Sequence, residues 1–127
     1  MTLDDLKSAV ESARRFTHTI DGRTFTLRTP TEHEIDLSYF RAVASGLEHG
    51  GASFEATREV STKAVIGWTE VMTTDILPSL PSEPLVYSPD AALLLFDAKQ
   101  EWFDSIKKAV RDRREESKAK TEEAAKN

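Results

Sequence analysis

The sequence contains no cysteine, which excludes disulfide bonds and thiolate metal ligands. It has no apolar run near the roughly 20 residues that a helix needs to cross a bilayer. Its acidic start, residues 1–5, lacks the basic residues and the apolar centre of a signal peptide. Together these absences predict a cytoplasmic protein that does not bind a membrane.

The chain also has fewer basic than acidic residues. The chain carries 17 Lys and Arg against 22 Asp and Glu, a formal net charge of −5 at pH 7. Because binding to nucleic-acid phosphates requires a concentration of cations, we expect no nucleic-acid partner. With 127 residues, of which 39% are hydrophobic, the chain is long enough for one domain with a modest core.

Catalytic and cofactor-binding motifs are missing as well. The three histidines, His18, His33 and His49, fall in separate predicted elements without the spacing of metal ligands. There is no Gly-x-Ser-x-Gly turn for a nucleophile, and Gly50-Gly51 lacks the Lys-Ser/Thr that follows a phosphate-binding loop. We therefore expect a protein that is not an enzyme, with no catalytic residue, metal or cofactor.

Two alternating segments joined by Asp21-Gly22 give the clearest local signal, over residues 15–28. Asp-Gly supplies the positive φ angles of a type I′ turn, which predicts a β-hairpin. A two-residue loop places Ile20 opposite Arg23, so that one face of the hairpin is apolar and the other carries threonines. The outer edges have no obvious partner elsewhere in the chain, so they can accept a strand of another chain.

An amphipathic helix is predicted over residues 3–14. Thr2 and Asp5 form a capping box ahead of apolar residues at spacings of three and four. Two interpretations of its apolar face stay open: the face covers the core, or it docks on a partner.

Two further helices are predicted in the middle of the chain. The first starts with a Thr-x-x-Glu capping box at Thr31 and Glu34, and we expect it to end at residues 48–51, where glycines can take a left-handed conformation. The second, capped by Ser53, covers residues 54–68 and is expected to be the segment around which the rest of the chain packs.

The end of this central helix is ambiguous in the sequence. The helical pattern can continue to Thr73 or Leu77, but several β-branched residues lower the helix propensity of residues 65–72. In the alternative interpretation these residues form a strand.

The C-terminal part starts with an irregular segment, because three prolines lie between residues 78 and 84. Ser88-Pro89-Asp90 then predicts a helix start, with a side-chain cap and proline at the first helical position. From there either one helix reaches about Arg113, or the helix breaks between residues 97 and 100.

No large apolar side chain follows residue 110, so residues 111–127 are predicted to form a charged, frayed or disordered tail. Residues 1–110 then form a single domain. The predicted fold class is mainly α (α+β), with four to five helices around one core and an N-terminal β-hairpin at about 15–28.

Aromatic side chains are numerous for so short a chain: six Phe, two Trp and two Tyr. Most belong in the core, but aromatic rings are also enriched at the centres of interfaces. We expect some of them to line an exposed groove that binds a partner. The candidate partner-binding residues are Phe16, Phe25, Trp68, Trp102 and Phe103.

Three segments occur in a familiar order: residues 22–31 before a helix, residues 64–71 around Gly67-Trp68, and residues 87–90 before a leucine-rich helix. This order resembles the small tail assembly chaperones of long-tailed bacteriophages and their prophage relatives. The loop after the tryptophan departs from the family pattern, which usually has glycine and acidic residues where this chain has residues 72–78.

The resemblance implies a mainly helical protein of the host cytoplasm that binds the aggregation-prone tape measure protein, and sometimes tail tube subunits, before tail assembly. It implies no metal, cofactor or catalytic group. A second hypothesis is a structural virion subunit, such as a small tail or connector protein, that forms a homo-oligomeric ring through its hairpin edges. A third, a small enzyme or nucleotide-binding protein, requires a pocket of convergent polar groups that the sequence does not show.

Overall fold

The computed structural model of the chain describes residues 1–126. Within those residues it is mainly α-helical, with six helices and one three-stranded antiparallel sheet of order β1-β2-β3. In chain order the elements are α1 (Leu3–Arg14), β1 (Arg15–Ile20), β2 (Arg23–Arg28), α2 (Glu32–Ala44), α3 (His49–Ala64), β3 (Val65–Thr69), α4 (Thr73–Ile76), α5 (Pro89–Ala98) and α6 (Gln100–Lys126). The predicted fold class, mainly α with an N-terminal β-hairpin, is confirmed, although the described chain has six helices instead of four to five.

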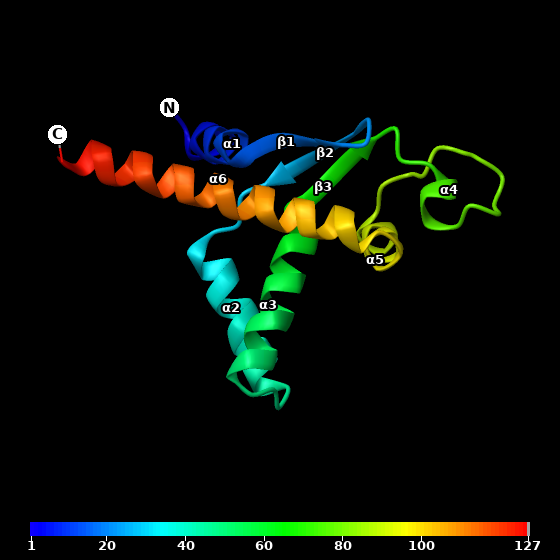
Figure 1. Cartoon of the computed structure of the whole chain (residues 1–127). Coiled ribbons are helices and arrows are strands. Elements are labelled where there is room, and N and C mark those ends of the chain that lie inside the picture. Colours follow the sequence, from blue (N-terminus) through cyan, green and yellow to red (C-terminus); the bar gives the residue numbers. More distant parts are fainter. Residues whose placement is uncertain (127) are drawn as a thin grey trace.

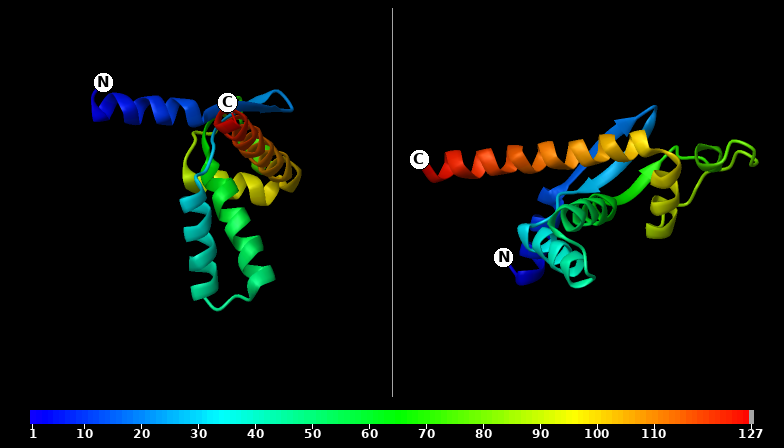
Figure 2. Two further views of the ribbon diagram at one scale, coloured as in Figure 1. Left: turned by 90° about the vertical axis from the view of Figure 1, so that its left-hand side faces the viewer. Right: turned by 60° about the horizontal axis from the view of Figure 1, so that its bottom comes forward.

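Three parts of the molecule can be distinguished in Figures 1 and 2. The long α6 crosses one face of the sheet, and α2 and α3 lie side by side as a helical hairpin that projects away from the sheet. The third part, α1, extends from the sheet in another direction. The sheet and the start of α6 therefore form the body, from which helices project.

The hairpin of β1 and β2 forms as its turn predicts. Asp21 and Gly22 have φ angles of 48° and 80°, the left-handed conformation that a type I′ turn requires at both positions. Ile20 lies opposite Arg23, so the predicted register is confirmed.

The predicted helix through Trp68 is wrong. α3 ends at Ala64, and the next five residues form β3, which is antiparallel to β2. Branched side chains disfavour a helix here, and strand pairing, with Phe25 opposite Trp68, satisfies backbone groups of β2 that otherwise lack partners. The strand interpretation is correct for residues 65–69 and does not hold for residues 70–72. Of the two outer edges of the hairpin, the edge of β1 stays open within the described residues.

The boundary between α2 and α3 also differs from the prediction. Gly46 has a φ angle of 101°, and its N–H donates to the carbonyl of Val43 at 3.0 Å, so glycine takes the left-handed position just after α2. Residues 49–51, expected to end a helix, begin α3 instead, and the expected cap Ser53 lies inside it. The chain reverses at the first suitable glycine, which leaves the Gly-Gly pair free to join the next helix.

Other helix boundaries follow the predicted capping chemistry. The capping box of Thr2 and Asp5 is complete, and the hydroxyl of Ser88 caps α5. At α2 the hydroxyl of Thr31 accepts from the N–H of Glu34 at 3.1 Å, but the carboxylate of Glu34 binds two arginines instead of closing the box. The predicted box is therefore only half formed.

The last third of the chain contains one confirmed and one revised expectation. The helix breaks between α5 and α6, at Lys99, as one of the two interpretations predicted. Residues 111–126 of the predicted tail are helical instead of frayed, with four-apart ion pairs such as Lys120 to Glu116 at 3.1 Å, while Asn127 lies outside the described residues. Neither α6 nor any other helix of the described chain is both long and apolar enough to cross a membrane.

The core lies between the sheet and helices α5 and α6. Phe25 and Leu27 of β2 are fully buried, and the ring of Phe25 contacts Trp68 and Trp102 edge-on, with 6.1 Å between ring centroids in both pairs. Strand alternation places these two β2 side chains on one face. The other apolar residues buried in this core are Ala64, Val65, Val71, Ala92, Leu95, Phe96, Phe103, Ile106 and Val110.

Truncation of one core leucine tests this packing. Leu95→Ala should lower the free energy of unfolding by about 2–5 kcal/mol, because Leu95 is 0% exposed. Its neighbour Leu94 is 59% exposed, so Leu94→Ala should cost less than about 1 kcal/mol. Denaturant unfolding measures both variants, and equal losses would contradict the described placement of α5.

Candidate functional site

The five aromatic residues predicted to bind a partner lie mainly in the core. Phe25 is 0% exposed, Trp102 5% and Phe103 8%, while Phe16 and Trp68 are half-buried and pack against the same core. The structure brings them together as packing residues, and Phe103 also lines a small groove of about 160 Å³ between α3, α5 and the start of α6. A role in partner binding stays a prediction for them.

The apolar face of α1 is exposed. None of the residues of α1 is buried against the rest of the described chain, and Leu3, Leu6 and Val10 are 66%, 49% and 48% exposed. We call these three residues the α1 face. The interpretation in which it covers the core is wrong for the described chain, and docking on a partner stays a prediction.

A second apolar surface follows α2 and the turn after it. Leu37, Phe40 and Val43 recur at a spacing of three within α2, so they follow one side of the helix. Leu47 lies in the turn after α2. Phe40 is 67% exposed, and the other three are 39–43% exposed. We call these four residues the α2 stripe. A different side of α2, with the buried Ser38, packs against α3.

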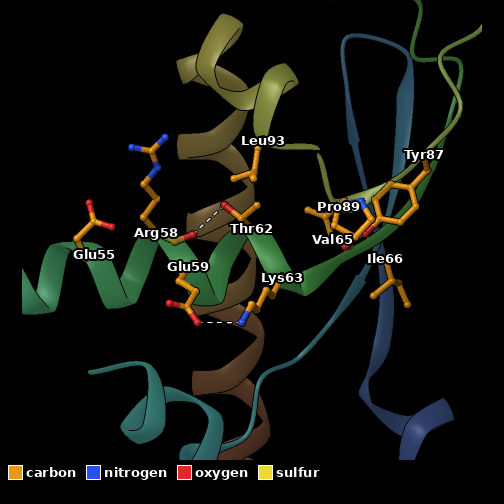
Figure 3. A pocket seen from close by; sticks show the side chains of 10 residues that line it. All are labelled: Glu55, Arg58, Glu59, Thr62, Lys63, Val65, Ile66, Tyr87, Pro89 and Leu93. Carbon is orange, nitrogen blue, oxygen red and sulfur yellow. Dashed lines mark hydrogen bonds and ion pairs between the residues drawn. The ribbon is translucent and has the colours of Figure 1, made fainter. Parts of the chain in front are cut away.

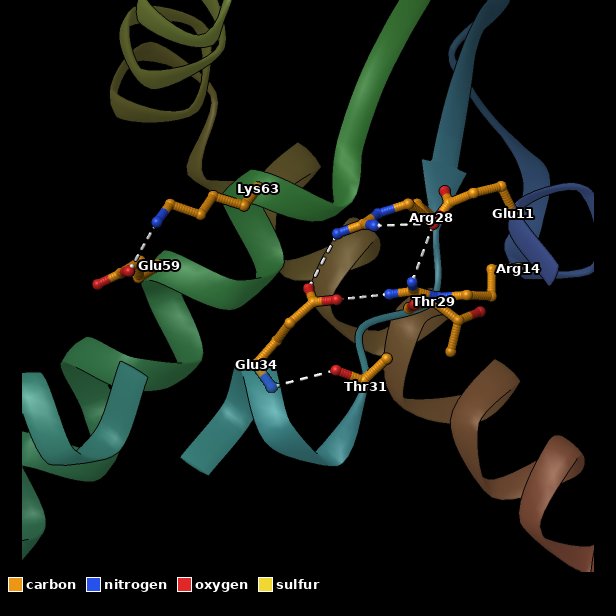
Figure 4. A network of polar contacts seen from close by, with 8 residues as sticks. All are labelled: Glu11, Arg14, Arg28, Thr29, Thr31, Glu34, Glu59 and Lys63. Carbon is orange, nitrogen blue, oxygen red and sulfur yellow. Dashed lines mark hydrogen bonds and ion pairs between the residues drawn. The ribbon is translucent and has the colours of Figure 1, made fainter. Parts of the chain in front are cut away.

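A cluster of arginine and glutamate residues fixes the corner where α1, β2 and α2 meet (Figure 4). Glu34 accepts from Arg14 Nη2 at 2.6 Å and from Arg28 Nη2 at 2.9 Å. Arg14 Nε also donates to the carbonyl of Thr29 at 2.9 Å, and Glu11 lies 3.2 Å from Arg14 and 3.5 Å from Arg28. Two cations face two carboxylates, and these charge-assisted bonds hold α1 at a set angle to α2.

In this corner the pKa of Glu34 is lowered. Partial burial by itself raises the pKa of Glu34, but the hydrogen bond from Arg14 and the charges of Arg28 and Arg14 outweigh it and hold the pKa below its ordinary value. Glu34 is therefore ionised at neutral pH, as the corner requires.

One groove lies between the second half of α3, β3 and the start of α5, with a volume of about 420 Å³ (Figure 3). Its charged residues are largely paired: Lys63 Nζ lies 2.9 Å from Glu59 Oε1, and Arg58 Nη2 lies 2.7 Å from Asp97 Oδ1. Burial raises the pKa of Tyr87, and its hydroxyl donates to a carbonyl of β3. The groove offers apolar walls rather than a convergent set of reactive groups.

A second groove, of about 610 Å³, separates α2 and α3 from α6. Ile35 and Val60 contribute to its apolar lining, and α6 contributes Lys107, Arg111 and Arg114. These cations are four and three residues apart, so they lie on one side of α6. Each cation already lies near a carboxylate of the chain: Arg114 Nη2 is 2.7 Å from Glu32, and Lys107 and Arg111 are 3.7 Å from Asp104 and Asp112.

One pair has the spacing of a nucleophile and its base. His18 Nε2 lies 2.8 Å from Ser105 Oγ, and partial burial, with the charge of Lys108, lowers the pKa of His18. Neither His18 nor Ser105 lines either groove, and within residues 1–126 no carboxylate is hydrogen-bonded to the ring. The pair is explained as a contact between β1 and α6.

The buried carboxylate of Asp75 has a structural partner too. Asp75 is 8% exposed and accepts from Arg23, which ties the tip of the β1–β2 hairpin to α4. In the part of the chain that the structure describes, no group of three or more His, Asp or Glu residues is arranged to hold a metal ion.

Comparison of the chain with protein-family models, with curated proteins and with solved structures found no match in any of the three. The candidate site therefore rests on the geometry of the described residues, namely the α1 face, the α2 stripe and the groove beside α6.

Sequence reasoning missed the α2 stripe as a separate surface. The apolar residues of this helix cover both the side with Ile35 and the side with Leu37 and Phe40. A helix packed on one side needs an apolar arc of little more than about 100°. The wider arc was the available signal that part of α2 faces away from its neighbours.

The corner cluster predicts a pH-dependent effect of Glu34→Gln. A carboxylate with a lowered pKa stabilises the fold above its unfolded pKa, near 4.5, and this contribution is lost as the pH falls through the folded pKa. Glu34→Gln should cost about 1 kcal/mol or less at pH 7, since its side chain is 36% exposed and solvent screens it. The difference should shrink as the pH falls below 4.5, as measured by denaturant unfolding.

The same substitution in an Arg14→Met, Arg28→Met background is the control, because the cations that lower the pKa are then absent. In that background the change in the free energy of unfolding caused by Glu34→Gln should depend less on pH. If Glu34→Gln alone destabilises the chain by the same amount at every pH, Glu34 acts through packing instead of charge.

Proposed function

We propose that this chain is a non-enzymatic binding protein whose exposed apolar surfaces hold an amphipathic segment of a partner protein. The observation that carries the proposal is the α2 stripe, four large apolar side chains on a helical hairpin that projects from the core. Full burial of an exposed side chain of this kind contributes about 1.5–3 kcal/mol, and a partner gains the part that corresponds to the surface still exposed, which is largest at Phe40. A partner that covers the stripe therefore gains substantial binding energy.

The surfaces also specify what kind of segment fits. The α2 stripe and the α1 face can take the apolar side of a helix. Lys107 and Arg111 of α6, whose own ion pairs are long at 3.7 Å, can also face carboxylates next to that apolar side. The net charge of −5 limits self-aggregation of a molecule that carries exposed apolar residues. Holding a partner in this way requires no reactive group.

Within this class, the chain is proposed to act as a phage tail assembly chaperone that keeps the tape measure protein soluble in the host cytoplasm before tail assembly, with tail tube subunits as further clients. The order of the three sequence segments supports this choice. The mainly helical fold is consistent with it. In this fold the Gly67-Trp68 segment lies in β3 and the Ser88-Pro89 segment starts α5, and both elements pack on the same core.

The alternative is a structural virion subunit that forms a ring. The open edge of β1 favours it, because a free strand edge can pair between subunits. In sedimentation experiments a ring subunit forms a closed oligomer of more than two copies at micromolar concentration. A chain that sediments as a monomer or dimer contradicts this alternative.

Co-expression tests the chaperone proposal. The full chain should raise the soluble fraction of the tape measure protein from the same phage or prophage several-fold. The double variant Leu37→Ser, Phe40→Ser should remove most of that gain, because two of the four apolar side chains of the α2 stripe become polar. Soluble and pelleted tape measure protein are compared after lysis.

The matched control is Val86→Ser, because Val86 is 83% exposed but lies in the segment before α5, away from the α2 stripe. This variant should retain the full effect. Circular dichroism checks that the variants fold. If the chain leaves the solubility of the tape measure protein unchanged, the chaperone proposal fails; if Val86→Ser and the α2 double variant behave alike, the α2 stripe is not the site.

A further inference from the structure

The backbone of β1 has one paired side and one free side. The N–H of Thr29 donates to the carbonyl of Arg14 at 2.8 Å, which marks this pair as hydrogen-bonded in the antiparallel register of β1 and β2. Hydrogen-bonded positions recur every second residue in such a ladder. Phe16, His18 and Ile20 therefore direct their backbone groups to β2.

Thr17 and Thr19 direct their N–H and C=O groups the other way. Among residues 1–126 these groups have no backbone partner, and both residues are exposed. A row of free donors and acceptors on an extended strand is a template for another strand. Threonine also has a high propensity for strands.

At the opposite edge of the sheet, the segment before α5 lies against β3 and covers part of it. Beside β3, the N–H of Leu85 donates to the carbonyl of Val71 at 2.8 Å, and Trp68 Nε1 donates to the carbonyl of Leu85 at 2.8 Å. The hydroxyl of Tyr87 donates to the carbonyl of Val65 at 2.6 Å. By contrast, β1 has no proline and no bulge, two devices that block an edge.

We infer that β1 pairs with β1 of a second copy of this chain, antiparallel and about a two-fold axis beside His18. In this register Thr17 lies opposite Thr19 of the second copy. Every outward N–H of these threonines then meets a C=O of the other copy. The two sheets join into one continuous sheet whose outer strands are the partly covered β3 strands.

Charge complementarity selects this register. It brings Arg15, at the start of β1, near Asp21 of the second copy, which lies in the turn just after β1; both residues are exposed, and Asp21 also accepts from Trp102 through Oδ2. His18 faces its counterpart across the axis, and it is neutral at pH 7 because burial and the charge of Lys108 lower its pKa. No like charges therefore lie directly opposite along the paired strands.

The assembly closes at two copies. A two-fold interface uses the same surface on both subunits and leaves no second β1 edge for a third copy. Pairing of one short strand buries less than the roughly 1,200 Å² of a standard interface, so we expect a dissociation constant in the micromolar range. This inference is independent of the proposed function and goes beyond it.

Sedimentation velocity of the full chain, from about 1 to about 200 µM, tests the inference with two variants of Thr17. Thr17→Pro removes an outward N–H without removing a hydrogen bond to β2, which an edge strand tolerates, and it should raise the dissociation constant at least about tenfold. Thr17→Val is the control: it keeps the N–H and the branched shape, and it should dimerise like the unmodified chain.

Arg15→Glu gives a second, independent test that leaves the backbone of β1 intact. It places a negative charge near Asp21 of the second copy and should raise the dissociation constant on the order of tenfold. Circular dichroism checks the fold of each variant, and if Thr17→Pro does not fold, Arg15→Glu decides. The inference is overturned if the unmodified chain stays monomeric at the highest concentration, if folded Thr17→Pro dimerises unchanged, or if Arg15→Glu has no effect.

Discussion

The packing of Phe25 against rings from three other elements is the contact on which the rest of the structure depends. Its ring centroid lies 6.1 Å from those of Trp68 and Trp102 and 6.4 Å from that of Phe96. Because β2 is paired on both sides, Phe25 sits on the most constrained strand of the sheet. Trp102 also donates Nε1–H to Asp21 Oδ2 at 3.1 Å, which holds the hairpin turn against α6. These contacts hold β2, β3, α5 and α6 together, although β2 lies far from the others in the sequence.

The sequence predicts the features that neighbouring residues decide. The Asp21-Gly22 turn needs only its own φ angles, and the caps at Thr2 and Ser88 need only the first turn of each helix. β3 could not be assigned from the sequence alone, because the choice between helix and strand at residues 65–69 depends on pairing with β2, whose residues lie about 40 positions earlier. The end of α2 was misplaced because two glycine sites suit a left-handed turn, and only the packing of the hairpin selects between them.

The candidate site was harder to predict than the fold, for a related reason. Large apolar side chains serve equally in a core and in an interface, so composition does not say which rings remain outside. Phe25 and Phe40 look alike in the sequence, yet one is 0% and the other 67% exposed. The difference arises because α2 projects from the body, held at its base by the cluster around Glu34. The proposed partner-binding surfaces are those that the core leaves uncovered, the α1 face and the α2 stripe.

Backbone hydrogen exchange of the full chain, alone and with the tape measure protein, tests this assignment most directly. The account predicts slower exchange on binding in α1 and α2, with β2 unchanged, since β2 is already paired on both sides and carries the buried Phe25. Faster exchange in β2 on binding, with no change in α1 and α2, would contradict it, because the core rings would then be the ones that open to meet the partner.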